Sequence, residues 1–139
     1  MKKLIIISLL LFSANTALRA QQLAYVQKKS DKIAVTPSVE RKLLDDVAQG
    51  KAYLIDVRTP EEYNQKHLQY AANINIKSAD FADQIRKLDK NKSIYLYCHS
   101  GNRSGRAADS LQTLGYHLSY NIGALDSLTK AVPGTIINI

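Results

Sequence analysis

Cysteine is nearly absent from this sequence: Cys98 is the only one in 139 residues. Exported proteins often use cysteines in pairs as disulfides, and a lone cysteine cannot form a bridge within its own chain. The sequence also has only three histidines. Their scatter gives no metal-ligand spacing, so we expect no metal and no other cofactor. Two interpretations of Cys98 stay open at this point, an inert buried thiol and a reactive one.

Long apolar runs are lacking as well. The run at 4–12 falls well short of the roughly 20 residues that a membrane span requires. It follows Lys2 and Lys3 and precedes a stretch of mostly small or polar residues that ends at Ala20. This layout is typical of a secretory signal peptide.

The expected organisation of the chain follows from that layout. We expect residues 1–20 to be the signal peptide, 21–31 to be a loose mature N-terminus and 32–139 to form one domain. Cleavage is expected after Ala20, with Ala17 as the alternative. The mature protein is then expected in the periplasm or secreted, with no membrane span.

A large excess of one charge is lacking too. Of the 19 basic residues, three lie in the expected signal peptide, which leaves 16 against 12 acidic residues and a net charge of +4. No block of Lys and Arg with interleaved aromatic residues is present, so we expect no nucleic-acid partner. A mildly basic surface can still attract a small anion. We expect the protein to be a monomer.

Short apolar runs alternate with segments of helical spacing along the rest of the chain. Strands are predicted at 32–36, 53–57, 72–76, 93–97 and 118–122. Helices are predicted from Pro37 to Gly50, from Pro60 to near Lys66, and over 79–88, 103–114 and 123–130, with a packed tail at 132–139. This alternation predicts an α/β fold, a small parallel sheet of about five strands with helices on both faces.

The predicted strand at 93–97 runs directly into Cys98, and ligands of such sheets bind beyond the carboxyl ends of the strands. Gly101 and Asn102 tolerate the backbone angles that direct several N–H groups inward, and the following helix adds its N-terminal N–H groups. Arg103 and Arg106 add positive charge. Such surroundings lower the pKa of a cysteine from about 8.5 to between about 3.5 and 7.5, which favours a reactive Cys98.

The length of this loop limits the size of the group that it can bind. Four residues separate Cys98 from Arg103. The signature of thiolate phosphatases has one residue more in this gap, and Ser104 stands where their Arg would be. A tighter loop fits a smaller group than phosphate, namely one extra sulfur atom on the thiolate, which is a persulfide. His99 could act as a general base or be an exposed loop side chain.

The segment 97–104, Tyr-Cys-His-Ser-Gly-Asn-Arg-Ser, resembles the active-site loop of the single-domain rhodanese-like sulfurtransferases. Further similarity to that family lies at 56–63, His67, 71–74, 114–116 and 120–123. The resemblance spans about residues 33–130, and with an exported setting the chain is most similar to periplasmic members. The upstream motif at 56–63 and the Cys98 loop are separated in the chain and occur in the family's order. Together they make the resemblance far more specific than one motif alone would.

The resemblance implies a three-layer rhodanese-like fold and a thiosulfate sulfurtransferase-like enzyme. Cys98 would be the catalytic nucleophile, a sulfur donor such as thiosulfate would load it, and cyanide or a thiol would accept the sulfur. The substrate-binding loop would consist of His99, Ser100, Gly101, Asn102, Arg103 and Ser104. A non-catalytic persulfide carrier, a phosphatase or arsenate reductase on the same fold, and a thiol-redox protein are the alternatives.

The resemblance also implies three supporting residues, Asp56, Arg58 and His67. We expect them to organise the loops rather than to react, with Arg58 paired to Glu61 or Glu62 and His67 acting as a hydrogen-bonding residue.

The sequence departs from the family's pattern at the expected mouth of the pocket. Lys66 replaces a Gly, Gln69-Tyr70 replaces a pair of small turn residues, and the segment Gly123-Ala124-Leu125 is not followed by the usual Trp. These departures leave the choice of substrate open.

Overall fold

The computed structural model describes residues 31–131 and 133–138. The expected signal peptide and all but the last residue of the expected loose N-terminus lie outside these residues. Within the described ranges no helix combines the length and the apolar character needed to cross a membrane.

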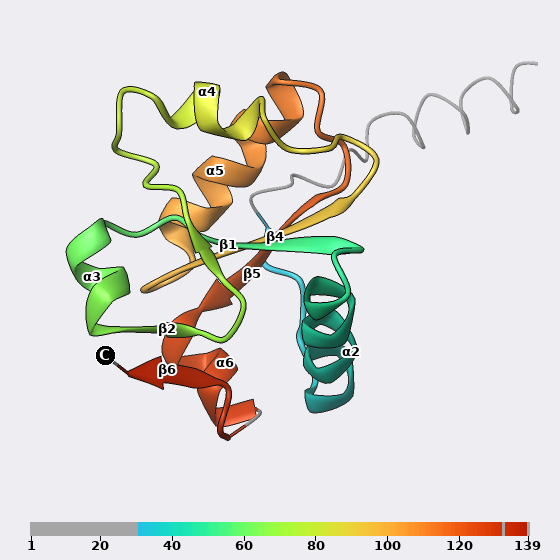
Figure 1. Ribbon diagram of the computed structural model, residues 1–139, viewed down its shortest axis with the longest axis vertical. Coiled ribbons are helices and arrows are strands. Elements are labelled where there is room, and N and C mark those ends of the chain that lie inside the picture. The colour runs from blue at the N-terminus through green and yellow to red at the C-terminus, as the bar shows by residue number, and fades with distance from the viewer. Residues whose placement is uncertain (1–30, 132, 139) are drawn as a thin grey trace, which may run out of the picture.

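A four-stranded parallel sheet forms the centre of the molecule, in the order β3-β1-β4-β5 (Figure 1). Its strands are β1 (Ala52–Asp56), β3 (Ala72–Asn73), β4 (Ser93–Cys98) and β5 (Ser119–Ala124). The predicted α/β class with a parallel sheet is therefore confirmed.

The segment 32–36, predicted as a further strand, is not one. It contributes a single parallel bridge, Lys32 to Asn121, and one hydrogen bond from Ile33 N to Asn121 O of 2.9 Å. The segment leaves the sheet because Thr36 caps the next helix, where its side chain accepts a hydrogen bond from Val39 N.

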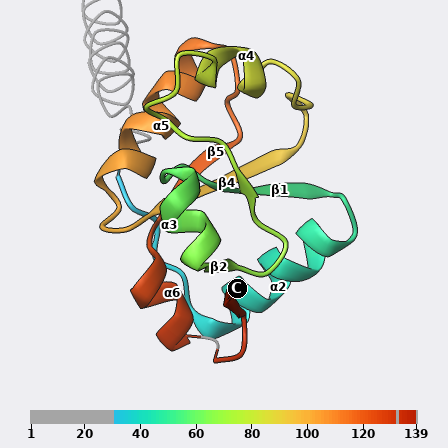
Figure 2. The same cartoon turned by 60° about the vertical axis from the view of Figure 1, so that its left-hand side comes forward.

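Helices cover both faces of the sheet (Figures 1 and 2). They are α2 (Pro37–Ala48), α3 (Pro60–Gln65), α4 (Phe81–Ile85), α5 (Asn102–Thr113) and α6 (Leu125–Ala131). Because side chains alternate along a strand, Ile94, Leu96 and Cys98 of β4 pack with α4 and α5, and Tyr97 packs with α2 and α6. This is the expected three-layer arrangement.

Further elements differ from the sequence predictions. The strand predicted at 72–76 is limited to the two residues of β3, Ala72 and Asn73. Helix α4 is shorter than 79–88, because the residues after Ile85 form tighter three-residue turns, with Leu88 N bonded to Ile85 O. The strand β2 (Lys66–Leu68) was not predicted; it pairs antiparallel with β6 (Ile136–Asn138), which is how the C-terminal tail packs.

Glu40 of α2 is buried in the apolar layer beside Leu43 and Leu44, with 2% of its surface exposed. Neither of its carboxyl oxygens has a hydrogen-bond partner among the described residues. Burial raises the pKa of Glu40 from 4.5 to about 7. Folding therefore favours the protonated acid, and the folded state loses stability as the pH rises from the unfolded pKa through the folded one.

We expect Glu40→Leu to stabilise the protein by about 3 kcal/mol at pH 8, and by less than about 1 kcal/mol at pH 5, through this ionisation alone. Urea denaturation at the two pH values measures both differences. Asp45→Asn, at an exposed acid of the same helix, is the matched control. Equal stabilisation by Glu40→Leu at pH 5 and pH 8 would show that the carboxyl group is not confined to the apolar layer.

Candidate active site

Cys98 lies at the carboxyl end of β4 and is fully buried, and the loop 99–101 connects it to α5. Gly101 precedes the helix in a left-handed conformation, with φ of 94°. A β-carbon there would also lie 3.4 Å from Gly123 Cα. The backbone angle is the feature that favours glycine, because residues with a side chain rarely adopt it.

The loop directs hydrogen-bond donors at the sulfur. Gly101 N lies 3.0 Å and Ser104 Oγ 3.5 Å from Cys98 Sγ. Burial by itself raises the pKa of the Cys98 thiol, but hydrogen bonds from Ser104 Oγ and from the N–H groups of Ser104, Gly101 and Ser100 outweigh it. The pKa of Cys98 is thereby lowered, so the surroundings favour the thiolate.

Arg103 forms a two-pronged ion pair with Glu62 of α3. Its Nη1 lies 2.6 Å from Glu62 Oε2 and its Nη2 lies 2.8 Å from Glu62 Oε1. The hydrogen bond from Arg103 is the main reason that the pKa of Glu62 falls to about 2, with the Thr59 N–H contributing. The pair attaches the first turn of α5, directly after the Cys98 loop, to α3, and its two residues lie 41 positions apart in the chain.

The predicted pairing of Arg58 with Glu61 or Glu62 is wrong. Arg58 instead pairs with Asp56, with Nη2 2.6 Å from Oδ2 and Nε 3.0 Å from both carboxylate oxygens. Glu62 is directed elsewhere because Thr59 N donates to its carboxylate in a capping box.

The Asp56–Arg58 pair is almost completely buried. Arg58 Nη2 also donates to Lys66 O at 2.7 Å, which connects the end of β1 to the start of β2. Among the described residues, neither side chain is a hydrogen-bond partner of Cys98 Sγ. The geometry therefore agrees with the expected organising role of the pair.

His67 is buried and stacks on Tyr63, with the ring centroids 3.8 Å apart. Its Nδ1 lies 2.9 Å from Tyr63 O, so it joins β2 to α3, as expected of a hydrogen-bonding residue. His99 is exposed on the loop, and Asn102 is exposed at the start of α5. Ser100 is exposed too, and its Oγ lies 3.5 Å from Asn102 N.

Two of the residues that depart from the family's pattern, Lys66 and Tyr70, are partly or largely exposed. Lys66 Nζ lies 3.0 Å from Asp126 Oδ1 and so connects β2 to α6. The hydrogen bond from Lys66 and its positive charge lower the pKa of Asp126. Tyr70 is exposed and has a positive φ of 66°.

Sequence reasoning gave no role to Asn121 and did not find the partner of Glu62. The side chain of Asn121 reaches both Ser104 and Gly101, although it comes from β5. The only sequence signal for Asn121 was its place in the motif at 120–123.

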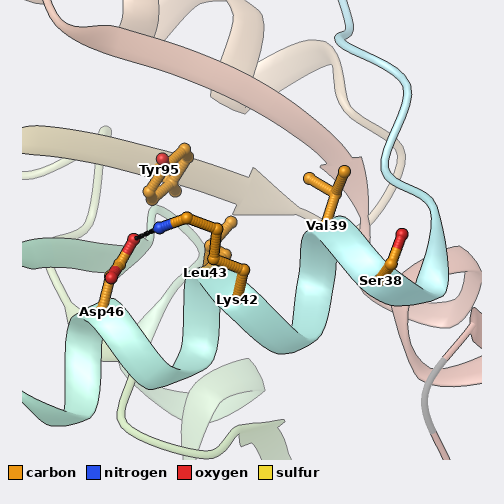
Figure 3. A pocket seen from close by; sticks show the side chains of 6 residues that line it. All are labelled: Ser38, Val39, Lys42, Leu43, Asp46 and Tyr95. Atoms are coloured by element: carbon orange, nitrogen blue, oxygen red, sulfur yellow. Dashed lines mark hydrogen bonds and ion pairs between the residues drawn. The ribbon is translucent and has the colours of Figure 1, made fainter.

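A hollow of about 360 Å³ lies between α2 and β4 (Figure 3). It is lined by Ser38, Val39, Lys42, Leu43, Asp46 and Tyr95. Tyr95 packs with the layer of α2, whereas Cys98 packs with the layer of α5, so the hollow lies on the other face of the sheet from the sulfur. In the part of the chain that the structure describes, no cluster of three His, Cys, Asp or Glu could hold a metal ion.

Known proteins are similar to this chain in sequence. Residues 39–130 match the rhodanese-like domain. The thiosulfate sulfurtransferase PspE of Escherichia coli is 39% identical over 74 residues, which is 53% of this chain and 71% of PspE. The uncharacterized protein YqhL of Bacillus subtilis is 39% identical over 72 residues, 52% of this chain and 56% of YqhL.

Solved structures agree. A rhodanese with anions from E. coli superposes with a TM-score of 0.51 at 34% identity, over 63% of this chain and 99% of that one. The Alr3790 protein from Anabaena sp. gives a TM-score of 0.61 at 25% identity, over 72% of this chain and 90% of that one. Together with the geometry of the Cys98 loop, these matches establish that the chain belongs to the rhodanese-like domain family.

Proposed function

We propose that the protein is a sulfurtransferase that carries a sulfane sulfur as a persulfide on Cys98. The observation that supports this most strongly is the set of donors around the sulfur, with Gly101 N at 3.0 Å and Ser104 Oγ at 3.5 Å. They favour the thiolate, which is the nucleophilic form of cysteine. The name of the similar E. coli protein, a thiosulfate sulfurtransferase, points to the same chemistry.

In the first step the Cys98 thiolate attacks the outer sulfur of thiosulfate. A new S–S bond forms, the S–S bond of the donor breaks, and sulfite leaves with the electron pair of that bond. In the second step cyanide or a thiolate attacks the outer sulfur of the persulfide. The acceptor departs as thiocyanate or as a persulfide, and the Cys98 thiolate is regenerated.

The loop residues have distinct parts in this proposal. The N–H groups of Ser100, Gly101 and Ser104 are directed at the sulfur and would stabilise the charge of the persulfide. Arg103 anchors the end of the loop through its ion pair with Glu62, and it adds positive charge near Cys98. Asp56, Arg58 and His67 keep the surrounding segments in place without touching the sulfur.

Initial-rate kinetics separate this proposal from its alternatives. With thiosulfate and cyanide varied together, we expect parallel lines in double-reciprocal plots, because sulfite must leave before cyanide reacts. Converging lines would contradict a persulfide intermediate. A persulfide that forms but passes to no acceptor would favour a sulfur carrier, and turnover of an aryl phosphate would favour a phosphatase.

We also propose that residues 1–20 direct export, that 21–31 are a loose mature N-terminus and that 32–139 form the mature domain. The basic start, the apolar run and the small residues before Gln21 support this. N-terminal sequencing of the protein recovered from cells should begin at Gln21, or at Leu18 if the alternative site is used. A start at Met1 or Lys2 would contradict export.

A further inference from the structure

Asn121 lies on β5 behind the Cys98 loop and has only 2% of its surface exposed. Its Oδ1 lies 2.7 Å from Ser104 Oγ and 3.0 Å from Gly123 N, and its Nδ2 lies 3.0 Å from Gly101 O. A backbone N–H can only donate and a carbonyl oxygen can only accept. These two backbone groups therefore fix which end of the amide carries the oxygen.

Ser104 has one hydroxyl proton and several acceptors within reach. They are Asn121 Oδ1 at 2.7 Å, Gly101 O at 3.1 Å and Cys98 Sγ at 3.5 Å. A carboxamide oxygen and a thiolate both lack a proton to give, so in its contact with Ser104 each of them must accept and Ser104 must donate. Asn121 and the thiolate thus compete for the same proton.

We propose that Asn121 is a positioning residue of the Cys98 site, which competes with the sulfur for the Ser104 proton and, through its hydrogen bond to Gly101 O, holds Gly101 where the N–H of that residue faces the sulfur. The proposal rests on the proposed role of Cys98 as a thiolate nucleophile. It assigns Asn121 no contact with the donor or the acceptor of sulfur.

Two hydrogen-bond arrangements follow from this geometry. When Cys98 is a thiol, its S–H donates to Ser104 Oγ, and Ser104 donates to Asn121 Oδ1. When Cys98 is a thiolate, the Ser104 hydroxyl rotates to donate to the sulfur, and Asn121 Oδ1 keeps the hydrogen bond from Gly123 N. Ionisation of Cys98 then needs only the rotation of one hydroxyl, and it leaves neither acceptor without a donor.

The charged groups around the site stay unchanged in the variants below. Arg103 interacts electrostatically with both Cys98 and Asp56, and it is paired with Glu62. The side chain of Lys32 covers Gly123 from the other side. Further charged or titratable groups of the surrounding elements include His99 on the loop, Arg58 beside Asp56, Tyr97 on β4, Lys66 on β2, Arg106 and Asp109 on α5, Tyr120 on β5 and Asp126 on α6.

The pH dependence of Cys98 alkylation by iodoacetamide tests the proposal. Asn121→Asp places a carboxylate, a stronger acceptor, beside Ser104 and removes the donor to Gly101 O. We expect the pKa of Cys98 to rise by about one unit or more, so that alkylation at a pH below the pKa slows by about tenfold or more. An unchanged alkylation profile would overturn the proposal.

A Ser104→Ala background separates action through Ser104 from a direct effect of the new charge. If Asn121 acts through Ser104, Asn121→Asp raises the pKa of Cys98 less in that background than in the natural sequence. A shift of the same size in both backgrounds would overturn the proposal. Gln112→Leu is the matched control, because Gln112 also hydrogen-bonds Tyr116 O and Ser119 Oγ near β5 but lies away from Cys98. It should leave the alkylation profile unchanged.

If Asn121→Asp does not fold, an NMR titration of the protein with its natural Asn121 tests the proposed role of this residue. The amide proton of Gly123 donates to Asn121 Oδ1, so its NMR shift should titrate with the same midpoint as Cys98 alkylation. In Ser104→Ala this titration should shrink or vanish, and a titration of undiminished size would overturn the proposal. Neither experiment uses a sulfur donor, so its result is independent of whether the protein transfers sulfur.

Discussion

Replacing Cys98 by serine should lower kcat/KM for sulfur transfer from thiosulfate to cyanide by at least about a thousandfold. Losing the nucleophile of a covalent mechanism is among the largest effects that a single substitution has on an enzyme. A serine hydroxyl in the same place cannot hold a persulfide. The donors at Gly101 and Ser104 would remain, but the atom that accepts the sulfur would be missing.

The fold of Cys98→Ser should survive, since the two side chains differ in one atom and Cys98 lies at the end of β4 beside a polar loop. Thermal unfolding of the variant checks this. The matched control is Ser110→Ala, on the exposed side of α5, which should keep the natural rate. Thiocyanate release by folded Cys98→Ser at a rate near that of the natural protein would contradict covalent catalysis by Cys98.

Asp56→Ala should lower the free energy of unfolding by about 3–5 kcal/mol. Asp56 is fully buried, and its carboxylate accepts hydrogen bonds from Arg58 Nε, Nη2 and N. Without that carboxylate, the Arg58 guanidinium stays in a buried place with an uncompensated charge, which is a costly arrangement. Urea denaturation at pH 7 measures the loss.

Two further variants test whether the loss of stability in Asp56→Ala comes from a buried, unpaired charge. Asp83→Ala removes an ion pair of similar length, with Arg86, that lies exposed on α4, and it should cost less than about 1 kcal/mol. Asp56→Leu combined with Arg58→Leu removes both buried charges and should recover part of the stability lost in Asp56→Ala. A loss in Asp56→Ala no larger than that in Asp83→Ala would mean that the Asp56–Arg58 pair is not buried.

The central sheet and the helices α2, α3 and α5 could be predicted because their signals are local. Thr36-Pro37 and Thr59-Pro60 begin helices where the side chain of each Thr caps the backbone. The pairing of β2 with β6 could not be predicted, because each strand has only three residues and they lie far apart in the chain. Short strands without a repeating pattern give no sequence signal of their partner.

The same distinction holds within the candidate site. The Cys98 loop could be predicted because strand, Gly101 and helix follow one another directly, and the left-handed conformation of Gly101 was one that glycine favours. The partners Glu62 and Asn121 reach the loop from α3 and β5, and only the fold brings them there. The mistaken partner of Arg58 has a different origin. Asp56 is nearer to Arg58 in the sequence than Glu61 or Glu62 is, and a capping box directs Glu62 to Arg103.

The intact mass of the protein before and after thiosulfate treatment, with free thiosulfate and sulfite removed, tests the central claim most directly. The natural protein should gain the mass of one sulfur atom, and cyanide should remove it again. Cys98→Ser should gain nothing. A natural protein whose mass does not change, or an equal gain in Cys98→Ser, would contradict the claim that Cys98 carries the sulfur.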